Sequence, residues 1–206
     1  MPSRNVIKEY ESGNYYHAYS RGVAKQPIFL DNQDKNKFLS ILSRYLDPQD
    51  TSFRGDGVYY RKFDKDLELL CYCLMGNHFH LLFYLVDDPD ALHVFIQSVL
   101  TAYTMYFNKR YKRVGTLFQG VFKASRITDD SYLLHITRYI HLNPKHYREY
   151  PFSSLNQYVG DDSLPWLKPA RILDMFEGVN YPQYLEDYEN YAATLENLKY
   201  ELANTP

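Results

Sequence analysis

Hydrophobic and polar positions change their period several times along the chain, and each period predicts one element. Residues 14–21 form an aromatic-rich run between two glycines, which is typical of a strand. Apolar side chains then recur at spacings of three and four over residues 32–46, a helical period that Asp47-Pro48 ends. Residues 49–66 contain glycines and scattered charge, so we expect a loop there.

A β-hairpin is predicted next, because the strand-like runs 67–75 and 78–86 flank the two-residue turn Gly76-Asn77. Acidic residues then mark the start of a long helix with apolar residues at helical spacing, and shorter elements follow it. These later elements are a helix that continues from Asp90 beyond Phe107, a strand near 121–127, a helix from about 131 to 143, and helical structure beyond Pro169.

This order of elements predicts the fold class α+β, with a ferredoxin-like antiparallel sheet, helices packed on one side and a helical C-terminal extension. A chain of 206 residues can form one core and a small appendage. We therefore expect a main domain over residues 1–165 and an acidic helical extension over residues 166–206.

Composition excludes several classes of protein. The chain has no apolar run near the roughly 20 residues that a membrane span needs, and its N-terminus has no apolar stretch after its basic residues. The sequence therefore predicts a globular, cytoplasmic protein with no membrane partner. Cys71 and Cys73 would leave one face of a strand side by side, which is poor disulfide geometry, so we expect reduced thiols.

Two histidines form the first candidate site. His78 and His80 lie two positions apart in a predicted strand, so both imidazoles leave the same face and can clamp a divalent metal that polarises a phosphate oxygen. A pair of structural histidines fits the same spacing. Structural zinc is a further alternative, since hairpin pairing sets Cys73 opposite His80 and Cys71 on the same face. Four ligands on one flat face surround an ion poorly, so we rank zinc below an open catalytic site.

A tyrosine on the helix near 131–143 is the second candidate. Tyr139 and Asn143 are one helical turn apart, so a phenol oxygen and an amide oxygen can converge on one cation, with Asn143 as a third metal ligand. A phenol with a pKa near 10 is a weak nucleophile, and nearby cations make phosphotyrosine chemistry feasible. In a chain with 22 tyrosines, the alternative is that Tyr139 only packs.

Residues 103–126 contain six Lys or Arg and no acid, interleaved with aromatic rings. Such a segment can contact phosphates with its cations and stack on bases with its rings, although a solvated basic helix end is the alternative. With a cation of the first strand added, the candidate nucleic-acid contacts are Arg21, Lys109, Arg110, Lys112, Arg113, Lys123 and Arg126.

The net charge of −2 hides this basic region. Residues 172–206 carry seven acids and one base, so the remainder of the chain holds 22 bases and 18 acids and has a charge of +4. The small overall charge therefore does not argue against a nucleic-acid partner.

Five blocks in order resemble a known family, the single-tyrosine transposases of the HUH superfamily, and within it the REP-associated tyrosine transposase group. The blocks are YHAYSRGVAKQPIF, CYCLMGNHFHLL, YTMYFNKRYKRVGTLFQGVFKA, DDSYLLHITRYIHLNP and YPFSSLNQYVG, which together cover roughly residues 14–175. Five ordered blocks are far more specific than the histidine spacing alone.

The resemblance implies a metal-dependent transposase and endonuclease that cleaves and rejoins single-stranded DNA near hairpins, with a ferredoxin-like catalytic domain and Mg²⁺ or Mn²⁺. By the same resemblance His78 and His80 hold the metal, Asn143 assists it, and Tyr139 forms a 5′-phosphotyrosine intermediate during DNA transposition and recombination. In dimeric relatives the tyrosine helix can serve the partner's histidines, and here a homodimer and a monomer stay equally open.

The chain departs from relatives at a few positions. It has Gly76 where they often have proline, Val121 where they have arginine, and Lys145-His146-Tyr147 where they have valine, arginine and alanine. None of these touches the histidine pair or the tyrosine, so an intact catalytic set is expected. The rival hypothesis is a domesticated, non-cleaving protein that recognises repetitive palindromic DNA.

Overall fold

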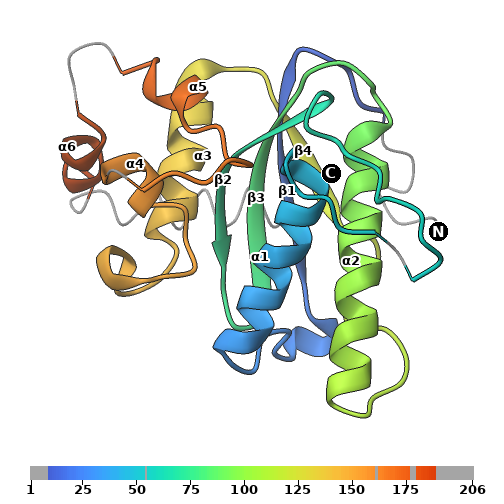
Figure 1. Ribbon diagram of the computed structural model, residues 1–206. Coiled ribbons are helices and arrows are strands. Elements are labelled where there is room, and N and C mark those ends of the chain that lie inside the picture. The colour runs from blue at the N-terminus through green and yellow to red at the C-terminus, as the bar shows by residue number, and fades with distance from the viewer. Residues whose placement is uncertain (1–8, 54, 161, 177–179, 189–206) are drawn as a thin grey trace.

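The computed structural model describes residues 9–53, 55–160, 162–176 and 180–188, which build a four-stranded antiparallel sheet (Figure 1). Its strands are β1 (Asn14–Arg21), β2 (Leu67–Leu74), β3 (His78–Leu85) and β4 (Lys123–Ile127). Their order across the sheet is β2-β3-β1-β4, so β1 and β3 are central. The predicted α+β, ferredoxin-like sheet is confirmed.

Two long helices cover one face of the sheet, as the sequence predicts (Figure 1). They are α1 (Asn32–Leu46) and α2 (Ala91–Arg110). The apolar stripe of α1 is buried with the alternate residues of β3 that include Phe79, Leu81 and Phe83, so the period-two and period-3.6 patterns meet in one core.

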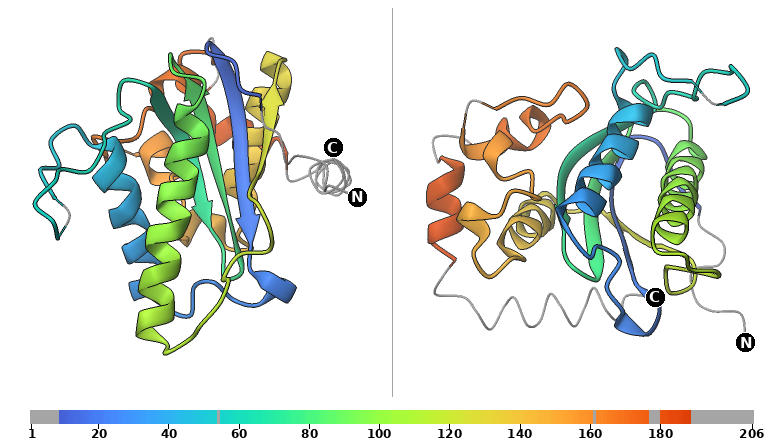
Figure 2. Two further views of the ribbon diagram at one scale, coloured as in Figure 1. Left: turned by 90° about the vertical axis from the view of Figure 1, so that its right-hand side faces the viewer. Right: turned by 60° about the horizontal axis from the view of Figure 1, so that its bottom comes forward.

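A third helix, α3 (Asp130–Leu142), lies on the opposite face (Figure 2). The Asp129 side chain caps it by accepting a 2.9 Å hydrogen bond from the Tyr132 amide, and its apolar side chains pack on the face of the sheet that carries Leu82 and Ile127. This face also carries His78 and His80, because they alternate with Phe79. The position of α3 therefore brings Tyr139 to the histidine face.

Short helices complete the described chain: η1 (Val23–Lys25), η2 (Tyr147–Glu149), α4 (Asn156–Val159), α5 (Ala170–Leu173) and α6 (Tyr181–Glu186). Trp166 belongs to the core beneath α1 and α2, whereas Tyr181 and Leu185 belong to the core beneath α3. Residues after the predicted boundary at 165 thus contribute to both cores, and the division into two domains stays a prediction. Within the described residues, no helix has the length and apolarity that a membrane crossing requires.

Residues that follow α3 in the sequence contact it and restrain its position. His141 contacts the Tyr181 hydroxyl at 2.6 Å through Nδ1 and Ser154 Oγ at 2.8 Å through Nε2. Arg138 lies over the rings of Tyr184 and Tyr188, with its guanidinium carbon 4.2 and 3.7 Å from their centroids. Arg138 and His141 flank Tyr139 in the sequence, so their contacts restrain the turn of α3 that carries Tyr139.

A buried carboxylate joins the start of α1 to the end of α2. Asp34 is fully buried and accepts hydrogen bonds from the Leu30 amide at 2.8 Å and from Arg110 at 2.6 Å. The hydroxyls of Tyr106 and Tyr111 donate to the same carboxylate at 3.1 and 2.9 Å. Every oxygen of this buried group is therefore satisfied, as burial of a charge requires.

We expect Asp34→Ala to lower the free energy of unfolding by about 3 kcal/mol, because it removes the acceptor of the Leu30 amide and of two tyrosine hydroxyls and one of the two carboxylates that Arg110 binds. Urea denaturation of the full chain measures this. Asp162→Ala removes an exposed carboxylate and is expected to change stability by about 0.5 kcal/mol at most. Equal stability of the two variants would show that the network contributes little.

Candidate active site

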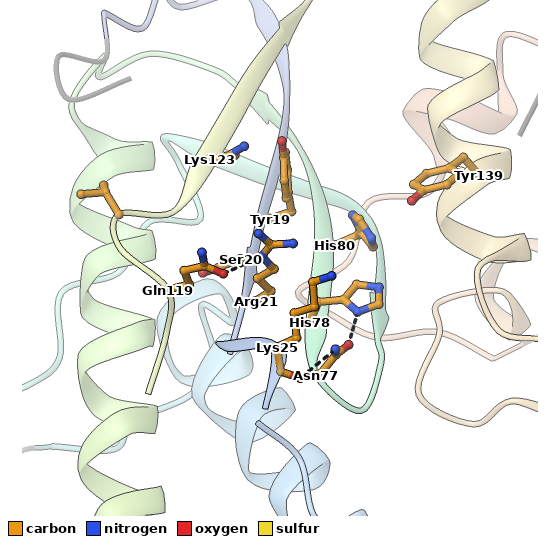
Figure 3. A pocket seen from close by; sticks show the side chains of 11 residues that line it. Tyr19, Ser20, Arg21, Lys25, Asn77, His78, His80, Gln119, Lys123 and Tyr139 are labelled. Atoms are coloured by element: carbon orange, nitrogen blue, oxygen red, sulfur yellow. Dashed lines mark hydrogen bonds between the residues drawn. The ribbon is translucent and has the colours of Figure 1, made fainter. Parts of the chain in front are cut away.

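A cavity of about 520 Å³ lies on the histidine face, where β1, β3 and β4 meet α3 (Figure 3). It is lined by Tyr19, Ser20, Arg21, Lys25, Asn77, His78, His80, Gln119, Val121, Lys123 and Tyr139. These residues come from segments far apart in sequence, and the sheet register aligns them: Arg21 pairs with His78, and Tyr19 pairs with both His80 and Lys123.

His80 is at the buried end of the cavity. Its Nδ1 lies 2.9 Å from Nε2 of His17, and its Nε2 is buried without a hydrogen-bond partner. Burial lowers the pKa of His80 well below its usual value and lowers that of His17 to about 3, so both rings are neutral at neutral pH. A neutral His80 with an unpartnered Nε2 is suited to ligate a metal ion.

His78 is closer to the opening and is paired on both sides. Its Nδ1 lies 2.6 Å from Oδ1 of Asn77, and its Nε2 lies 3.3 Å from Oδ1 of Asn143. Burial lowers the pKa of His78 as well, although a hydrogen bond that the protonated ring can donate to Asn143 Oδ1 opposes this shift. The structure thus brings together the two histidines and the amide that the sequence selects.

Tyr139 points from α3 toward His80 (Figure 3). Its ring meets that of His80 edge to face, with centroids 5.4 Å apart, and only 6% of the residue is exposed. Burial raises the pKa of the Tyr139 hydroxyl, and a hydrogen bond with Asn143 partly offsets this effect. Tyr139 thus belongs to the hydrophobic core beneath α3.

Cations surround the opening of the cavity. Arg21, Lys25 and Lys123 line it, and none of the described lining residues is acidic. Gln119 fixes the position of Arg21 by two hydrogen bonds. The side-chain Oε1 of Gln119 accepts from Arg21 Nε at 2.7 Å, and the backbone N–H of Gln119 donates to the Arg21 carbonyl at 2.8 Å. This arrangement favours an anionic ligand such as a phosphodiester.

The other predicted nucleic-acid contacts lie outside the cavity. Arg110 is committed to Asp31 and Asp34, and Arg126 pairs with Glu11 at 2.7 Å. Arg113 donates to Asn108 at 3.2 Å, and Lys109 and Lys112 are exposed near the end of α2. Of the seven predicted cations, Arg21 and Lys123 therefore line the site, and direct roles for the other five stay predictions.

The candidate metal ligands are two imidazoles and an amide oxygen, and the cysteines do not join them. No group of three or more His, Cys, Asp or Glu is arranged as a metal site among the described residues. Burial raises the pKa of Cys73 to about 12, which keeps a thiol rather than the thiolate that zinc binds, and Cys73 Sγ lies 3.7 Å from Met75 Sδ. Two neutral imidazoles and an amide oxygen could hold a divalent cation and leave positions open for water and phosphate.

Sequence reasoning missed several residues of the site: His17, Tyr19, Lys25, Asn77 and Gln119. His17 and Tyr19 alternate with Arg21 on one strand, so the period-two pattern offered a signal for both. Asn77 was assigned only to the hairpin turn. Lys25 and Gln119 lie in irregular segments, and no pattern in the sequence pointed to them.

Comparison with known families identifies the segment that carries this site. The family described as IS200-like transposases matches residues 58–143, a range that contains both cavity histidines, Tyr139 and Asn143. Residues 58–143 are thus similar to the IS200-like transposases. The predicted membership in the single-tyrosine transposase group is confirmed at this level.

Two solved structures are similar to this chain at low sequence identity. One, a REP-associated tyrosine transposase bound to a REP hairpin, is 15% identical, with a TM-score of 0.54 over 75% of this chain and 84% of the other. Another, a candidate transposase from Deinococcus radiodurans R1, is 14% identical, with a TM-score of 0.40 over 68% of this chain and 95% of the other. The first likeness supports the fold assigned above. No curated protein matches the chain.

Proposed function

We propose that this IS200-like protein is a metal-dependent endonuclease and strand transferase that cleaves and rejoins single-stranded DNA through Tyr139. The observation that carries the proposal is the contact of the Tyr139 ring with His80, beside a cavity lined by cations. Nucleophile, ligand set and phosphate-binding cations thus occupy one site within one chain. The proposal assigns catalysis to residues 1–165, since every cavity residue precedes residue 144.

The proposed reaction is a transesterification. Tyr139 Oη attacks the phosphorus, the bond from phosphorus to the 3′-oxygen breaks, and a 5′-phosphotyrosine and a 3′-hydroxyl form. The phenol releases its proton, and the leaving 3′-oxygen takes one up. Because one phosphoester replaces another, the reverse attack by a 3′-hydroxyl rejoins DNA without ATP.

His78, His80 and Asn143 would hold Mg²⁺ or Mn²⁺, which would supply Lewis-acid polarisation of a phosphate oxygen. The residues of the chain contribute the remaining effects. Arg21, held by Gln119, and Lys123 neutralise charge on the phosphate. The buried face of Tyr139 packs on His80 and fixes the ring before attack, so less orientational entropy is lost.

Hairpin DNA is the proposed partner. A REP hairpin is bound in the solved transposase that shares the fold, and the cationic cavity of this chain suits a DNA backbone. We propose that a single-stranded segment beside a hairpin enters the cavity, because the attacked phosphate must reach Tyr139 close to the sheet.

The test uses a 3′-labelled oligonucleotide that contains a hairpin and a single-stranded flank, because the proposed 5′-phosphotyrosine link keeps the 3′ fragment on the protein. We expect the full chain to form a covalent adduct in Mn²⁺ or Mg²⁺, visible as a band of reduced mobility in denaturing gels, and to form none with a chelator present. Binding is measured in parallel by fluorescence anisotropy. Tight binding without an adduct in any divalent metal would contradict the proposed chemistry.

A further inference from the structure

Asn77 lies in the turn between β2 and β3, and backbone hydrogen bonds hold this turn against the segment 22–29. The Asn77 carbonyl accepts from the Gly22 amide at 2.8 Å, and the Gly76 carbonyl accepts from the amides of Ile28 and Phe29 at 2.9 and 3.0 Å. The side chain of Asn77 is therefore free for another role.

Two contacts fix the orientation of the Asn77 amide. Its Nδ2 donates to the Lys25 carbonyl at 3.1 Å, and a carbonyl can only accept, so the nitrogen must face Lys25. Its Oδ1 then faces Nδ1 of His78 at 2.6 Å. The Lys25 carbonyl belongs to a turn in which Ala24 and Lys25 have left-handed φ values of 51° and 60°, a conformation that costs roughly 1–2 kcal/mol per residue.

This orientation decides where the proton of His78 lies. Neither amide oxygen has a hydrogen to donate and a neutral ring carries one proton, so the 2.6 Å contact with Asn77 takes that proton on Nδ1 in preference to the 3.3 Å contact with Asn143. Nε2 then carries a lone pair and faces Asn143 Oδ1, another acceptor, at 3.3 Å. Two acceptors directed at the same space form a chelating pair for a cation.

We propose that Asn77 is a positioning residue that presets the His78 tautomer for metal binding. Neutral histidine in water favours the proton on Nε2, the atom that the metal needs, so a free ring would have to shift its proton before binding. The Lys25–Asn77–His78 relay removes that step. The inference rests on the proposed metal-dependent function for its purpose, but the tautomer itself is a property of the metal-free chain.

The contact between His17 and His80 contrasts with this relay. Either ring can donate in that pair, and the outer nitrogens, His17 Nδ1 and His80 Nε2, are both buried without a partner. The geometry therefore leaves the His80 tautomer open in the absence of metal. His78 and His80 provide an internal comparison within one protein.

The experiment is a long-range ¹H–¹⁵N correlation spectrum of the metal-free full chain, labelled on histidine nitrogens and recorded at pH 8. We expect His78 of the wild type to be protonated on Nδ1. In Asn77→Ala the proton is expected to move toward Nε2, whereas Asn77→Asp keeps an acceptor and is expected to retain Nδ1–H. Asn14→Ala removes a half-buried asparagine that lies outside the cavity and bonds to the Ser12 carbonyl at 3.0 Å, and it is expected to leave the spectrum unchanged.

Metal affinity gives the second measurement, by titration of Mn²⁺ into the same proteins. We expect Asn77→Ala to bind Mn²⁺ roughly 10–100-fold more weakly than the wild type, as loss of a partner behind a metal-ligating histidine usually causes. A wild-type His78 protonated on Nε2, or unchanged Mn²⁺ affinity in Asn77→Ala, would overturn the proposed role. A wild type with the expected tautomer that binds no Mn²⁺ would instead overturn the proposed metal-dependent function.

Discussion

Replacing Tyr139 with phenylalanine is expected to abolish the covalent protein–DNA adduct while hairpin affinity stays within about threefold of the wild type. The variant removes only the hydroxyl. The ring that meets His80 at 5.4 Å is retained, so the packing beneath α3 persists. Loss of the hydrogen bond with Asn143 is expected to cost about 1 kcal/mol of stability.

Adduct formation in Mn²⁺ with a 3′-labelled hairpin oligonucleotide measures this effect. Tyr132→Phe is a matched control, because it makes the same change two turns earlier on α3 at a residue that does not line the cavity. We expect it to form adduct at a rate close to that of the wild type. An adduct that persists in Tyr139→Phe would refute the assigned nucleophile, and peptide mapping of that adduct would locate the true one.

Substitution of His80 is expected to have the second large effect. His80→Leu replaces the ring by an apolar side chain of similar volume and removes Nε2, the buried nitrogen that has no partner in the protein. We expect Mn²⁺ affinity to fall at least roughly 100-fold and the adduct to disappear, because one imidazole and an amide oxygen hold a divalent cation weakly. Hairpin affinity in the presence of a chelator is expected to stay within threefold, since Arg21 and Lys123 are unchanged.

Calorimetric titration of Mn²⁺ tests this at pH 7.5, where burial keeps His80 neutral because it lowers the pKa of that ring. His146→Leu is the control, since His146 is exposed and lies outside the cavity. Full cleavage by His80→Leu would show that the reaction does not depend on the histidine pair. Loss of hairpin binding together with cleavage would instead indicate a folding defect, which a thermal unfolding curve would reveal.

The predictions from sequence were most accurate where the chain has a strong period. Asn14–Arg21 and Asn32–Leu46 form the strand and helix expected of them, because each alternation matches the face that the sheet buries. The histidine pair could be placed on one face for the same reason. In the structure, α1 and α2 lie on one face and α3 on the other, an arrangement that a one-dimensional pattern does not determine.

Predictions for individual cations were less informative. The basic segment 103–126 suggested one phosphate-binding surface, but Arg110 is held by Asp31 and Asp34, residues more than 70 positions away in sequence. A charge in the sequence does not show whether it is already paired, because ion pairs form between elements that folding brings together. Arg21 and Lys123 line the cavity because their strands pair at its edge.

The sequence by itself determined the strands and helices, the shared face of His78 and His80, and the one-turn spacing of Tyr139 and Asn143. These properties depend on local periods of two and 3.6 residues. The tertiary structure decided that Tyr139 packs on His80, that His17 lies behind His80, and that Asn77 connects the Lys25 carbonyl to His78. Each of these is a contact between segments distant along the chain, and only the register of the sheet and the docking of α3 bring those segments together.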